Sequence, residues 1–246
     1  MFSKSQFKLI KSLTQKKYRL KQKLFVVEGK KAIFELLNSS LQLHSIYTTE
    51  DIFNAERNKT FFIDEPDLKK ISNLTTPQTA LAIFHIPETQ EPDLSGLVVA
   101  LDGVQDPGNL GTIIRMCDWF GVEQLLCSEG TVDCYNPKVV QATMGSISRV
   151  NINYVSLPEA LKAANKNISV YGAFLEGDII YSQDLKDGII VMGNEANGIS
   201  SEIETLITKK LLIPQFGKIQ ETESLNVATA TAIFLSEFRR TEFTGK

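Results

Sequence analysis

The sequence predicts an α/β protein with two domains, and three observations support this prediction. Short apolar segments rich in β-branched and aromatic residues alternate with segments of helical periodicity. A polar stretch containing two prolines interrupts the alternation once, and the basic side chains are concentrated before it. We therefore expect a small basic domain over residues 1–85, a linker over 86–95 and a larger α/β domain over 96–246.

Ten segments have the composition of strands, because each is short, apolar and rich in residues that favour a pleated sheet. They are LFVVEG (24–29), SIYTT (45–49), TFFID (60–64), ALAIFHI (80–86), LVVALD (97–102), QLLCS (124–128), INYVS (152–156), ISVYGAF (168–174), GIIVMG (188–193) and KLLIP (210–214). The last six are almost wholly apolar, which is typical of a sheet covered by helices on both faces.

Helical patterns lie between many of these strands. They span residues 30–38, 109–120, 137–146, 157–165, 200–208 and 224–240. Strands that alternate with helices indicate βαβ units and a mostly parallel sheet. The stretch IPETQEPDLSG (86–96) fits neither pattern, since it combines two prolines and three acids with few apolar residues. It is the predicted linker.

The composition excludes several classes of protein. The 246 residues are 43% hydrophobic and 22% charged, with no apolar run long enough for a transmembrane helix and no signal-peptide pattern at the N-terminus. The three cysteines form no C-x-x-C pair, and His44 and His85 are the only histidines. The sequence therefore offers few side chains for a disulfide framework, a zinc site or a histidine triad. We expect a cytoplasmic protein without a metal and without a membrane partner.

The net charge of −3 conceals a strong asymmetry. Residues 1–31 carry ten basic side chains and one acidic one, a charge of +9, which leaves −12 for the rest of the chain. Such separation favours a polyanion as partner, contacted by Lys16, Lys17, Arg19 and Lys21 among others. The aromatic residues between them are candidates for stacking on bases, although burial is the better expectation for Phe25. The alternative is a basic helix face that is merely solvated.

Three strand ends in the second domain have unusual composition, and ligands of open α/β sheets bind at such ends. In LVVALDGVQDPGNLGTIIRMCDWFG (97–121) a buried strand leads into a glycine-rich loop, where Asn109 is a candidate helix cap. Arg115 follows on a largely apolar helix, which suggests that it meets an anion; an internal salt bridge is the alternative. The loop matches neither the dinucleotide fingerprint nor the P-loop.

The second strand end is IIVMGNEANGIS (189–200). Gly193 exposes backbone groups at the strand end, and Glu195 is placed to pair with Arg115 or to orient a ligand, unless the segment is only a tight turn. The third is LLIPQFGKIQETESLNVATATAIFLSEF (211–238), where Ser224 is the candidate cap of the final helix. Capping by Ser224 leaves Asn226 unexplained.

Together these motifs resemble those of the SpoU-type (TrmH-like) RNA 2′-O-methyltransferases of the SPOUT class. DPGNLGTIIR, MGNEANGIS and IP…G…ESLNVATATAI occur in the order found in that family. IKSLTQKKYRLKQKLFVVEGKKAIFELL and LTTPQTALAIF resemble the substrate-binding domain often fused to it, so the resemblance covers nearly the whole chain.

The resemblance implies an L30e-like N-terminal domain, a C-terminal α/β domain with a deep trefoil knot, a homodimer and S-adenosylmethionine as cofactor. The substrate would be ribosomal or transfer RNA, ribosomal being favoured, with the four basic residues named above binding it. Carried over by motif, the catalytic residues are Arg115, Asn109, Glu195, Ser224 and Asn226. The cofactor-binding residues are Gly193, Asn194, Ile213, Pro214 and Leu225.

Two departures from the family pattern concern the third motif. The insertion KIQETE separates Gly217 from the Ser-Leu-Asn, and Ala228 stands where a serine is common. Neither removes a proposed catalytic group. Two other functions remain open: a non-catalytic RNA-binding protein that kept the fold, disfavoured by the intact polar set, and an unrelated nucleotide-binding α/β enzyme, disfavoured by the absent phosphate-binding motifs.

Overall fold

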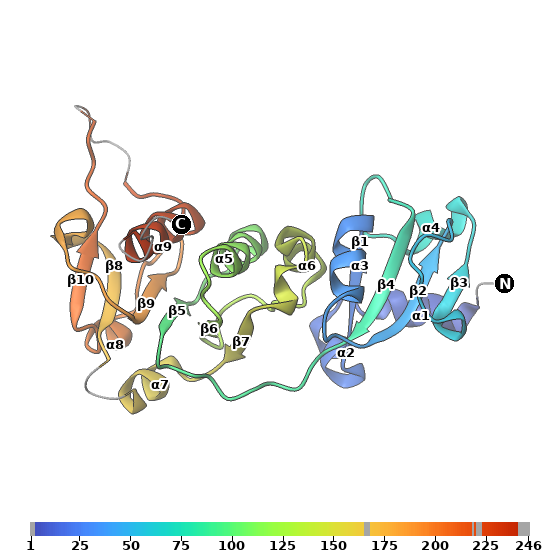
Figure 1. Cartoon of the computed structure of the whole chain (residues 1–246), viewed down its shortest axis with the longest axis horizontal. Coiled ribbons are helices and arrows are strands. Elements are labelled where there is room, and N and C mark those ends of the chain that lie inside the picture. Colours follow the sequence, from blue (N-terminus) through green and yellow to red (C-terminus); the bar gives the residue numbers. More distant parts are fainter. Residues whose placement is uncertain (1–2, 165–167, 218, 220–222, 241–246) are drawn as a thin grey trace. The chain divides into compact units, whose positions relative to one another are not determined.

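The computed structural model describes residues 3–164, 168–217, 219 and 223–240, which form two compact units (Figure 1). The first unit contains residues 1–88 together with 133–148, and the second contains 89–132 and 149–246. Residues 133–148 thus pack with the N-terminal residues, whereas the predicted domain boundary at the linker assigns them to the larger domain. No helix in the described ranges is long and apolar enough to cross a membrane.

The first unit is built on a four-stranded mixed sheet of order β1-β4-β2-β3. Its strands are β1 (Leu24–Glu28), β2 (Leu43–Thr48), β3 (Thr60–Phe62) and β4 (Ala80–His85). Its helices are α1 (Lys4–Ser12), α2 (Lys16–Gln22), α3 (Lys30–Leu37), α4 (Glu65–Ile71) and α6 (Pro137–Thr143), with 3₁₀ turns η1 (Arg57–Lys59) and η2 (Ser146–Ser148). Strand β4 lies antiparallel to β1 and β2, whereas β2 and β3 are parallel.

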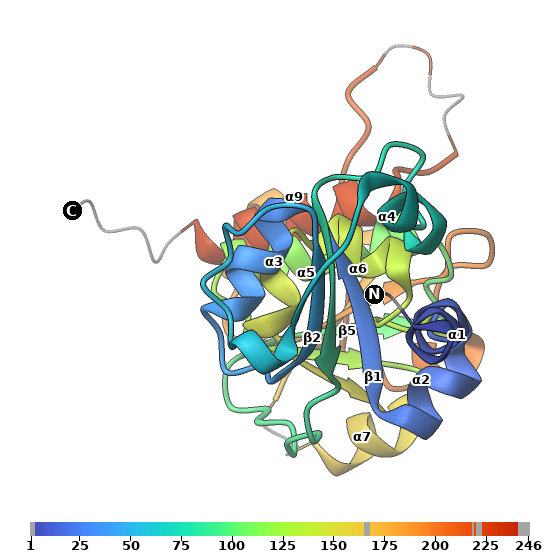
Figure 2. The ribbon, with the colours of Figure 1, turned by 90° about the vertical axis from the view of Figure 1, so that its right-hand side faces the viewer.

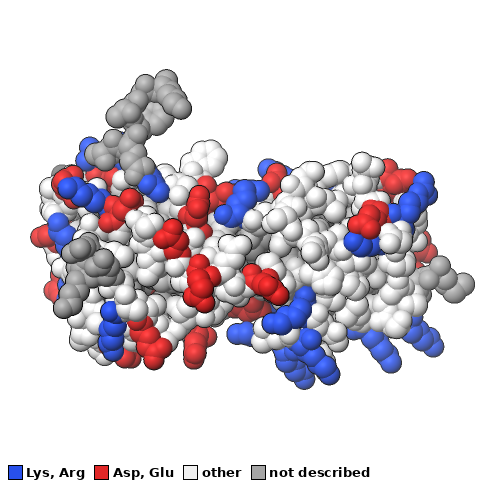
Figure 3. All heavy atoms as spheres, turned by 60° about the horizontal axis from the view of Figure 1, so that its bottom comes forward, with Lys and Arg blue, Asp and Glu red and all other residues white. Residues whose placement is uncertain are grey.

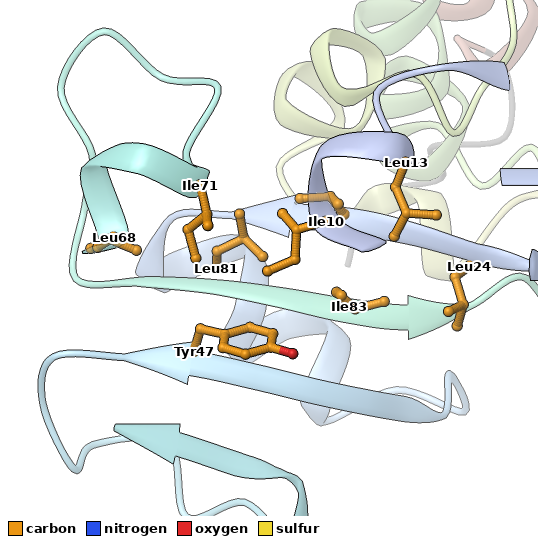
Figure 4. Packing of buried hydrophobic residues seen from close by; sticks show 9 residues of the cluster. Ile10, Leu13, Leu24, Tyr47, Leu68, Ile71, Leu81 and Ile83 are labelled. Atoms are coloured by element: carbon orange, nitrogen blue, oxygen red, sulfur yellow. The ribbon is translucent and has the colours of Figure 1, made fainter. Parts of the chain in front are cut away.

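Alternation along the strands supplies both faces of this sheet with apolar side chains. Leu81 and Ile83 of β4 pack in one core with Ile10 of α1, Leu13 just after it, and Tyr47 (Figure 4). Helix α3 lies on the opposite face of the sheet from α1 (Figure 2). Two-sided cover explains why β1 is buried along its whole length.

The second unit is a six-stranded sheet of order β10-β8-β9-β5-β6-β7, in which every neighbouring pair is parallel. Its strands are β5 (Leu97–Asp102), β6 (Gln124–Cys127), β7 (Asn151–Tyr154), β8 (Val170–Ile179), β9 (Gly188–Gly193) and β10 (Lys209–Leu212). Its helices are α5 (Pro107–Trp119), α7 (Leu157–Ala163), α8 (Ser201–Glu204) and α9 (Val227–Arg239), with the 3₁₀ turn η3 (Ile180–Ser182). The predicted parallel α/β domain is confirmed.

Helices cover both faces of this sheet. Leu157 and Leu161 of α7 and Ile203 of α8 pack on one face against alternate residues of the central strands. Helices α5 and α9 contact one another, and α9 also contacts β9 (Figure 1). The apolar side of α9 is therefore largely covered within the chain, with Phe238 edge-on to Tyr171 at 4.9 Å between ring centres.

Candidate active site

The predicted site loops all leave the second sheet at the same edge. Asp102 at the end of β5 pairs with Gly193 at the end of β9, so the first two loops emerge side by side. The strands are parallel, and the third loop follows the end of β10 at the same edge of the sheet. Ligands of open parallel sheets bind outside these carboxyl ends, particularly where the chain reverses its direction of progress through the sheet.

The first loop ends in a helix cap that differs from the predicted one. Helix α5 begins at Pro107, and the Asp106 carboxylate accepts a hydrogen bond from the backbone N–H of Asn109 at 2.8 Å. Asn109 therefore lies in the first turn and is not the cap. Asp-Pro before a helix is a recognisable start signal, and it favours Asp106, the first residue of the motif DPGNLGTIIR, as the cap. The Asn109 side chain is consequently available for other contacts.

The second loop is a tight turn closed by its own backbone. Asn194 and Gly198 exchange two backbone hydrogen bonds of 2.9 Å, and a Cβ at Gly193 would lie 2.3 Å from the carbonyl carbon of Gly198. Only glycine fits at that strand end. The Asn194 side chain donates to the carbonyl oxygen of Gly103 at 2.7 Å, which ties the second loop to the first. The segment is thus a tight turn, and its contact with the first loop is compatible with the predicted role in a site.

A chain of side-chain hydrogen bonds joins all three loops. The amide nitrogen of Asn226 donates to the amide oxygen of Asn109 at 2.8 Å, and the amide nitrogen of Asn109 donates to a carboxylate oxygen of Glu195 at 3.0 Å. These residues are up to 117 positions apart in the sequence. The structure thus brings together three of the five predicted catalytic residues.

Glu195 anchors one end of this series of hydrogen bonds. Its carboxylate also accepts hydrogen bonds from the backbone N–H groups of Gln105 at 3.2 Å and Asp106 at 3.1 Å. Partial burial by itself would raise the pKa of Glu195, but the hydrogen bonds from Asn109 and the backbone outweigh it and lower that pKa below its ordinary value. A carboxylate that is held ionised in this way is a weak base, so its contacts suit it to positioning Asn109.

Asn226, and not Ser224, caps the final helix. The Asn226 side-chain oxygen accepts from the backbone N–H groups of Ala228 at 3.0 Å and Thr229 at 3.2 Å, and α9 begins at Val227. Ser224 lies two residues before this cap, exposed and outside any helix. The prediction that Ser224 caps the helix is therefore corrected, because the asparagine occupies the position from which a side chain reaches the first turn.

Arg115 lies apart from the hydrogen-bonded chain. Its side chain is exposed on α5, and it forms no ion pair or hydrogen bond with any residue that the structure describes. Six residues of helix separate it from Asn109, which places it roughly 9 Å further along and about 120° around the axis. The expected pairing with Glu195 and the alternative of an internal salt bridge are both absent from the described residues, so an exposed guanidinium remains for an anion.

The predicted cofactor-binding residues lie along the same strand edge. Gly193 and Asn194 form the second loop, Ile213 and Pro214 directly follow β10, and Leu225 precedes the cap of α9 with 49% of its surface exposed. Within the described ranges, the backbone groups of Ile213 and Leu225 take part in no hydrogen bond. Unpaired backbone donors and acceptors beside apolar side chains suit a ligand with a heteroaromatic edge, so these residues fit S-adenosylmethionine. Most of the insertion KIQETE lies outside the described residues.

The four predicted RNA-binding residues belong to α2 of the first unit. Lys16, Lys17 and Lys21 are exposed, and Figure 3 shows Lys and Arg side chains gathered on the underside of this unit. Arg19 is different: only 2% of its surface is exposed. Its guanidinium donates to the Asp133 carboxylate at 3.0 Å and to the backbone carbonyl of Leu13 at 2.8 Å.

The prediction that Arg19 contacts RNA is accordingly corrected. Four of the five N–H donors of this guanidinium are engaged by the Asp133 carboxylate and two backbone carbonyls, and the side chain is too deeply buried to meet a phosphate. Its partner Asp133 is 114 residues away, so the sequence pattern of α2 could not separate Arg19 from the lysines.

A doubly covered parallel sheet with polar loops at one edge, together with a second unit built on a mixed sheet, defines a two-unit α/β protein with a candidate ligand site at its strand ends. Residues 96–236 match the model of the SpoU rRNA Methylase family, and residues 4–82 match the MRM3-like substrate binding domain. The chain belongs to the SpoU rRNA methylase family and carries an MRM3-like substrate-binding domain at its N-terminal side.

Similar proteins share both units. The 23S rRNA (guanosine(2553)-2′-O)-methyltransferase RlmP of Bacillus subtilis (strain 168) is 31% identical over 238 residues, which cover 93% of this chain and 94% of that protein. A structure described as a putative RNA methyltransferase of the TrmH family from Porphyromonas gingivalis is 40% identical with a TM-score of 0.90, covering 98% of this chain and 99% of the other. An AdoMet-bound rRNA methyltransferase from Sinorhizobium meliloti is 29% identical with a TM-score of 0.85, covering 98% and 97%.

Proposed function

We propose that this protein methylates the 2′-hydroxyl of a ribose in the RNA of the large ribosomal subunit, with S-adenosylmethionine as methyl donor. One observation carries the proposal: the hydrogen-bonded chain of Asn226, Asn109 and Glu195 closes the three family motifs into one site. Ribosomal RNA is favoured over transfer RNA because the Bacillus subtilis 23S rRNA enzyme resembles this chain over both units.

The side chains of the site support a division of roles. S-adenosylmethionine supplies an activated methyl group on a sulfonium, so the protein has to place the ribose hydroxyl in line and assist loss of its proton. Asn109 and Asn226 are held in register by Glu195 and are placed to orient the ribose and its neighbours. Arg115 would bind the adjacent phosphate and favour the alkoxide that develops on the oxygen. Ser224, exposed beside the cap, would contact the substrate.

Two further features belong to the proposal. We expect the segment after β10 and helix α9 to form the trefoil knot known in this family, since α9 returns to lie beside α5 at the start of the same unit. We also expect a homodimer. The apolar side of α9 offers little surface for its contact, because Ala228, Phe234 and Phe238 are buried within the chain. Trp119, at the end of α5 with 82% of its surface exposed, is the better candidate contact.

The experiment is methyl transfer from tritiated S-adenosylmethionine to ribosomal RNA and to transfer RNA, both extracted from a strain lacking the gene. Mapping of 2′-O-methyl groups in RNA from the parent and deletion strains then identifies the nucleotide. We expect label in large-subunit RNA and the loss of one 2′-O-methyl site in the deletion strain. Label confined to transfer RNA would overturn the proposed substrate, and the absence of any transfer would favour the non-catalytic alternative.

A further inference from the structure

The first unit contains a groove that includes no residue of the three candidate active-site loops and has no role in the proposed chemistry. It lies between the end of α3, the segment leading into β2, the loop before η1 and the end of β4. Its volume is about 810 Å³. That size is within the range of pockets that bind small organic molecules and exceeds what one nucleotide needs.

Aromatic rings form the walls of this groove. Phe34 of α3 packs on Phe53 with 4.8 Å between ring centres, and His44 lies 5.5 Å from His85. Both histidines of the chain are thus in one groove. Flat rings with open faces are the surfaces on which unpaired bases stack.

A break in the sheet directs His44 into this position. Leu43 pairs with Phe84 and Ser45 pairs with Ile83, so the register shifts and His44 is the extra residue of a bulge in β2. Bulges of this kind re-aim a side chain and are frequent beside functional sites. Burial, His85 and Lys59 together lower the pKa of His44, which keeps its ring uncharged at neutral pH.

The polar lining matches a nucleotide better than it matches an apolar ligand. The exposed residues Asn38, Gln42 and Asn54 lie at the groove and offer amide donors and acceptors to the edge of a base. Lys59 supplies a cation, although it is paired with Glu56 at 2.6 Å.

One end of the groove, at His85, lies beside the residue that begins β1, shortly after the basic helix α2. The backbone N–H of Ile86, the residue after His85, donates to the carbonyl oxygen of Lys23 at 2.8 Å, directly after α2. His85 therefore lies next to the residues that link α2 to β1. A strand of RNA that passes this end of the sheet would place phosphates on the lysines of α2 and a base in the groove.

We propose that this groove binds the base of an unpaired nucleotide in the RNA substrate, and that His44, His85 and Phe34 form its stacking surface. The proposal rests on the proposed function in one respect, because it takes the polyanion that the basic unit recruits to be RNA. It adds a preference for single-stranded over fully paired RNA, which the lysines alone do not provide, since they contact the phosphates of both.

The test compares binding of a single-stranded RNA oligomer and of a blunt duplex of the same length to the full chain. The groove variant is His85→Ala with Gln42→Ala, two exposed positions, and the matched control is Lys69→Ala on α4, on the other side of the sheet. We expect the groove variant to bind the single strand roughly 5- to 150-fold more weakly, the range for removal of one base–aromatic stack. Its affinity for the duplex should stay within about twofold of wild type.

The slope of single-strand affinity against salt separates the groove from general charge. The groove variant should keep the wild-type slope. Lys69→Ala should change the slope by no more than about one and should leave the preference for single strands unchanged. Thermal unfolding should be unchanged in both variants. Equal affinity of the groove variant and the wild type for the single strand overturns the proposal, as does parallel loss of single-strand and duplex binding.

Methyl transfer by the wild type is measured on the same preparations. A wild type that shows the groove-dependent preference without any methyl transfer would refute the proposed function and leave the groove intact. A wild type that methylates ribosomal RNA but binds single strand and duplex alike would refute the groove alone.

Discussion

At the residue scale, the carboxylate of Glu195 holds the site together because it receives hydrogen bonds from two backbone N–H groups and from Asn109. These bonds favour the ionised form, so the folded protein holds the pKa of Glu195 below the value in the unfolded chain. The stabilising contribution is complete above the unfolded pKa of about 4.3 and is lost as the pH falls through the folded value.

Replacement of Glu195 by glutamine tests whether the ionised carboxylate stabilises the folded protein. We expect Glu195→Gln to lower the free energy of unfolding near neutral pH, because a neutral amide oxygen accepts the same hydrogen bonds less strongly. The difference from wild type should shrink as the pH falls below about 4. Urea unfolding of both proteins over a pH series measures it, and a difference that stays constant down to about pH 3 would contradict the ionised clamp.

Arg115 is the residue whose exposure argues for a role toward substrate. We expect Arg115→Ala to abolish methyl transfer while S-adenosylmethionine affinity changes by no more than a few-fold, since Arg115 forms no hydrogen bond or ion pair with the other described site residues. Arg115→Lys should fail as well if the phosphate is held by two parallel N–H groups. Isothermal titration and a turnover assay report the two properties separately. Substantial turnover by the alanine variant would remove Arg115 from the catalytic set.

At the scale of elements, the start of α9 combines two functions in one side chain. The oxygen of Asn226 caps the helix and its nitrogen donates to Asn109. The two can be separated, because aspartate keeps a capping oxygen but has no donor for Asn109.

We therefore expect Asn226→Ala to lower the free energy of unfolding by about 1 kcal/mol, as removal of a cap does, and Asn226→Asp to leave it nearly unchanged. Both variants should lose methyl transfer, by up to about 100-fold, because Asn109 is no longer held in place. Chemical denaturation and turnover are measured on the same three proteins. An active aspartate variant would show that the cap is the only role of Asn226.

The strands are predictable from the sequence to a greater extent than the helix ends. All ten predicted strands occur, since short apolar runs reflect burial directly. Helices α1, α2 and α4 are absent from the prediction, because their charged residues obscure a narrow apolar side. The motifs identify the three loops of the candidate site but misassign the helix caps of the first and third: Asp106 and Asn226 compete with Asn109 and Ser224, and only the backbone geometry decides which side chain reaches the first turn.

Interactions between distant residues account for the rest of the difference. The burial of Arg19 depends on Asp133, and the groove beside His85 depends on a bulge at His44. Neither leaves a periodic signal in the sequence, because both arise from how separate segments meet in space.

At the scale of the whole molecule, the charge of the first unit predicts how RNA is held. We expect replacement of Lys16, Lys17 and Lys21 by alanine to weaken RNA binding and to reduce its log–log dependence on salt by about two, near 0.7 for each phosphate of a single strand that is no longer neutralised. Arg19 is left in place because it is buried. Binding across a salt series measures the effect, and titration with S-adenosylmethionine provides the control. An unchanged slope would mean that the lysines are only solvated.

The exposed indole of Trp119 leads to a prediction about assembly. If the protein is a dimer through its second unit, a large apolar side chain with 82% of its surface exposed is expected at the contact. The wild type should have twice the monomer mass by light scattering at micromolar concentration, and Trp119→Ser should shift the equilibrium toward monomer. A wild type that is monomeric under these conditions would refute the dimer.

The distance in sequence between Asn109 and Asn226 has a consequence for when the site can form during synthesis of the chain. The four strands of the first unit, all six strands of the second sheet and Glu195 are translated before Asn226 is made. Until the final helix emerges and docks beside α5, Asn109 lacks one of its two partners. If the basic unit binds RNA and Asn109 is catalytic as proposed, we expect a chain that stops before Asn226 to bind RNA without methylating it.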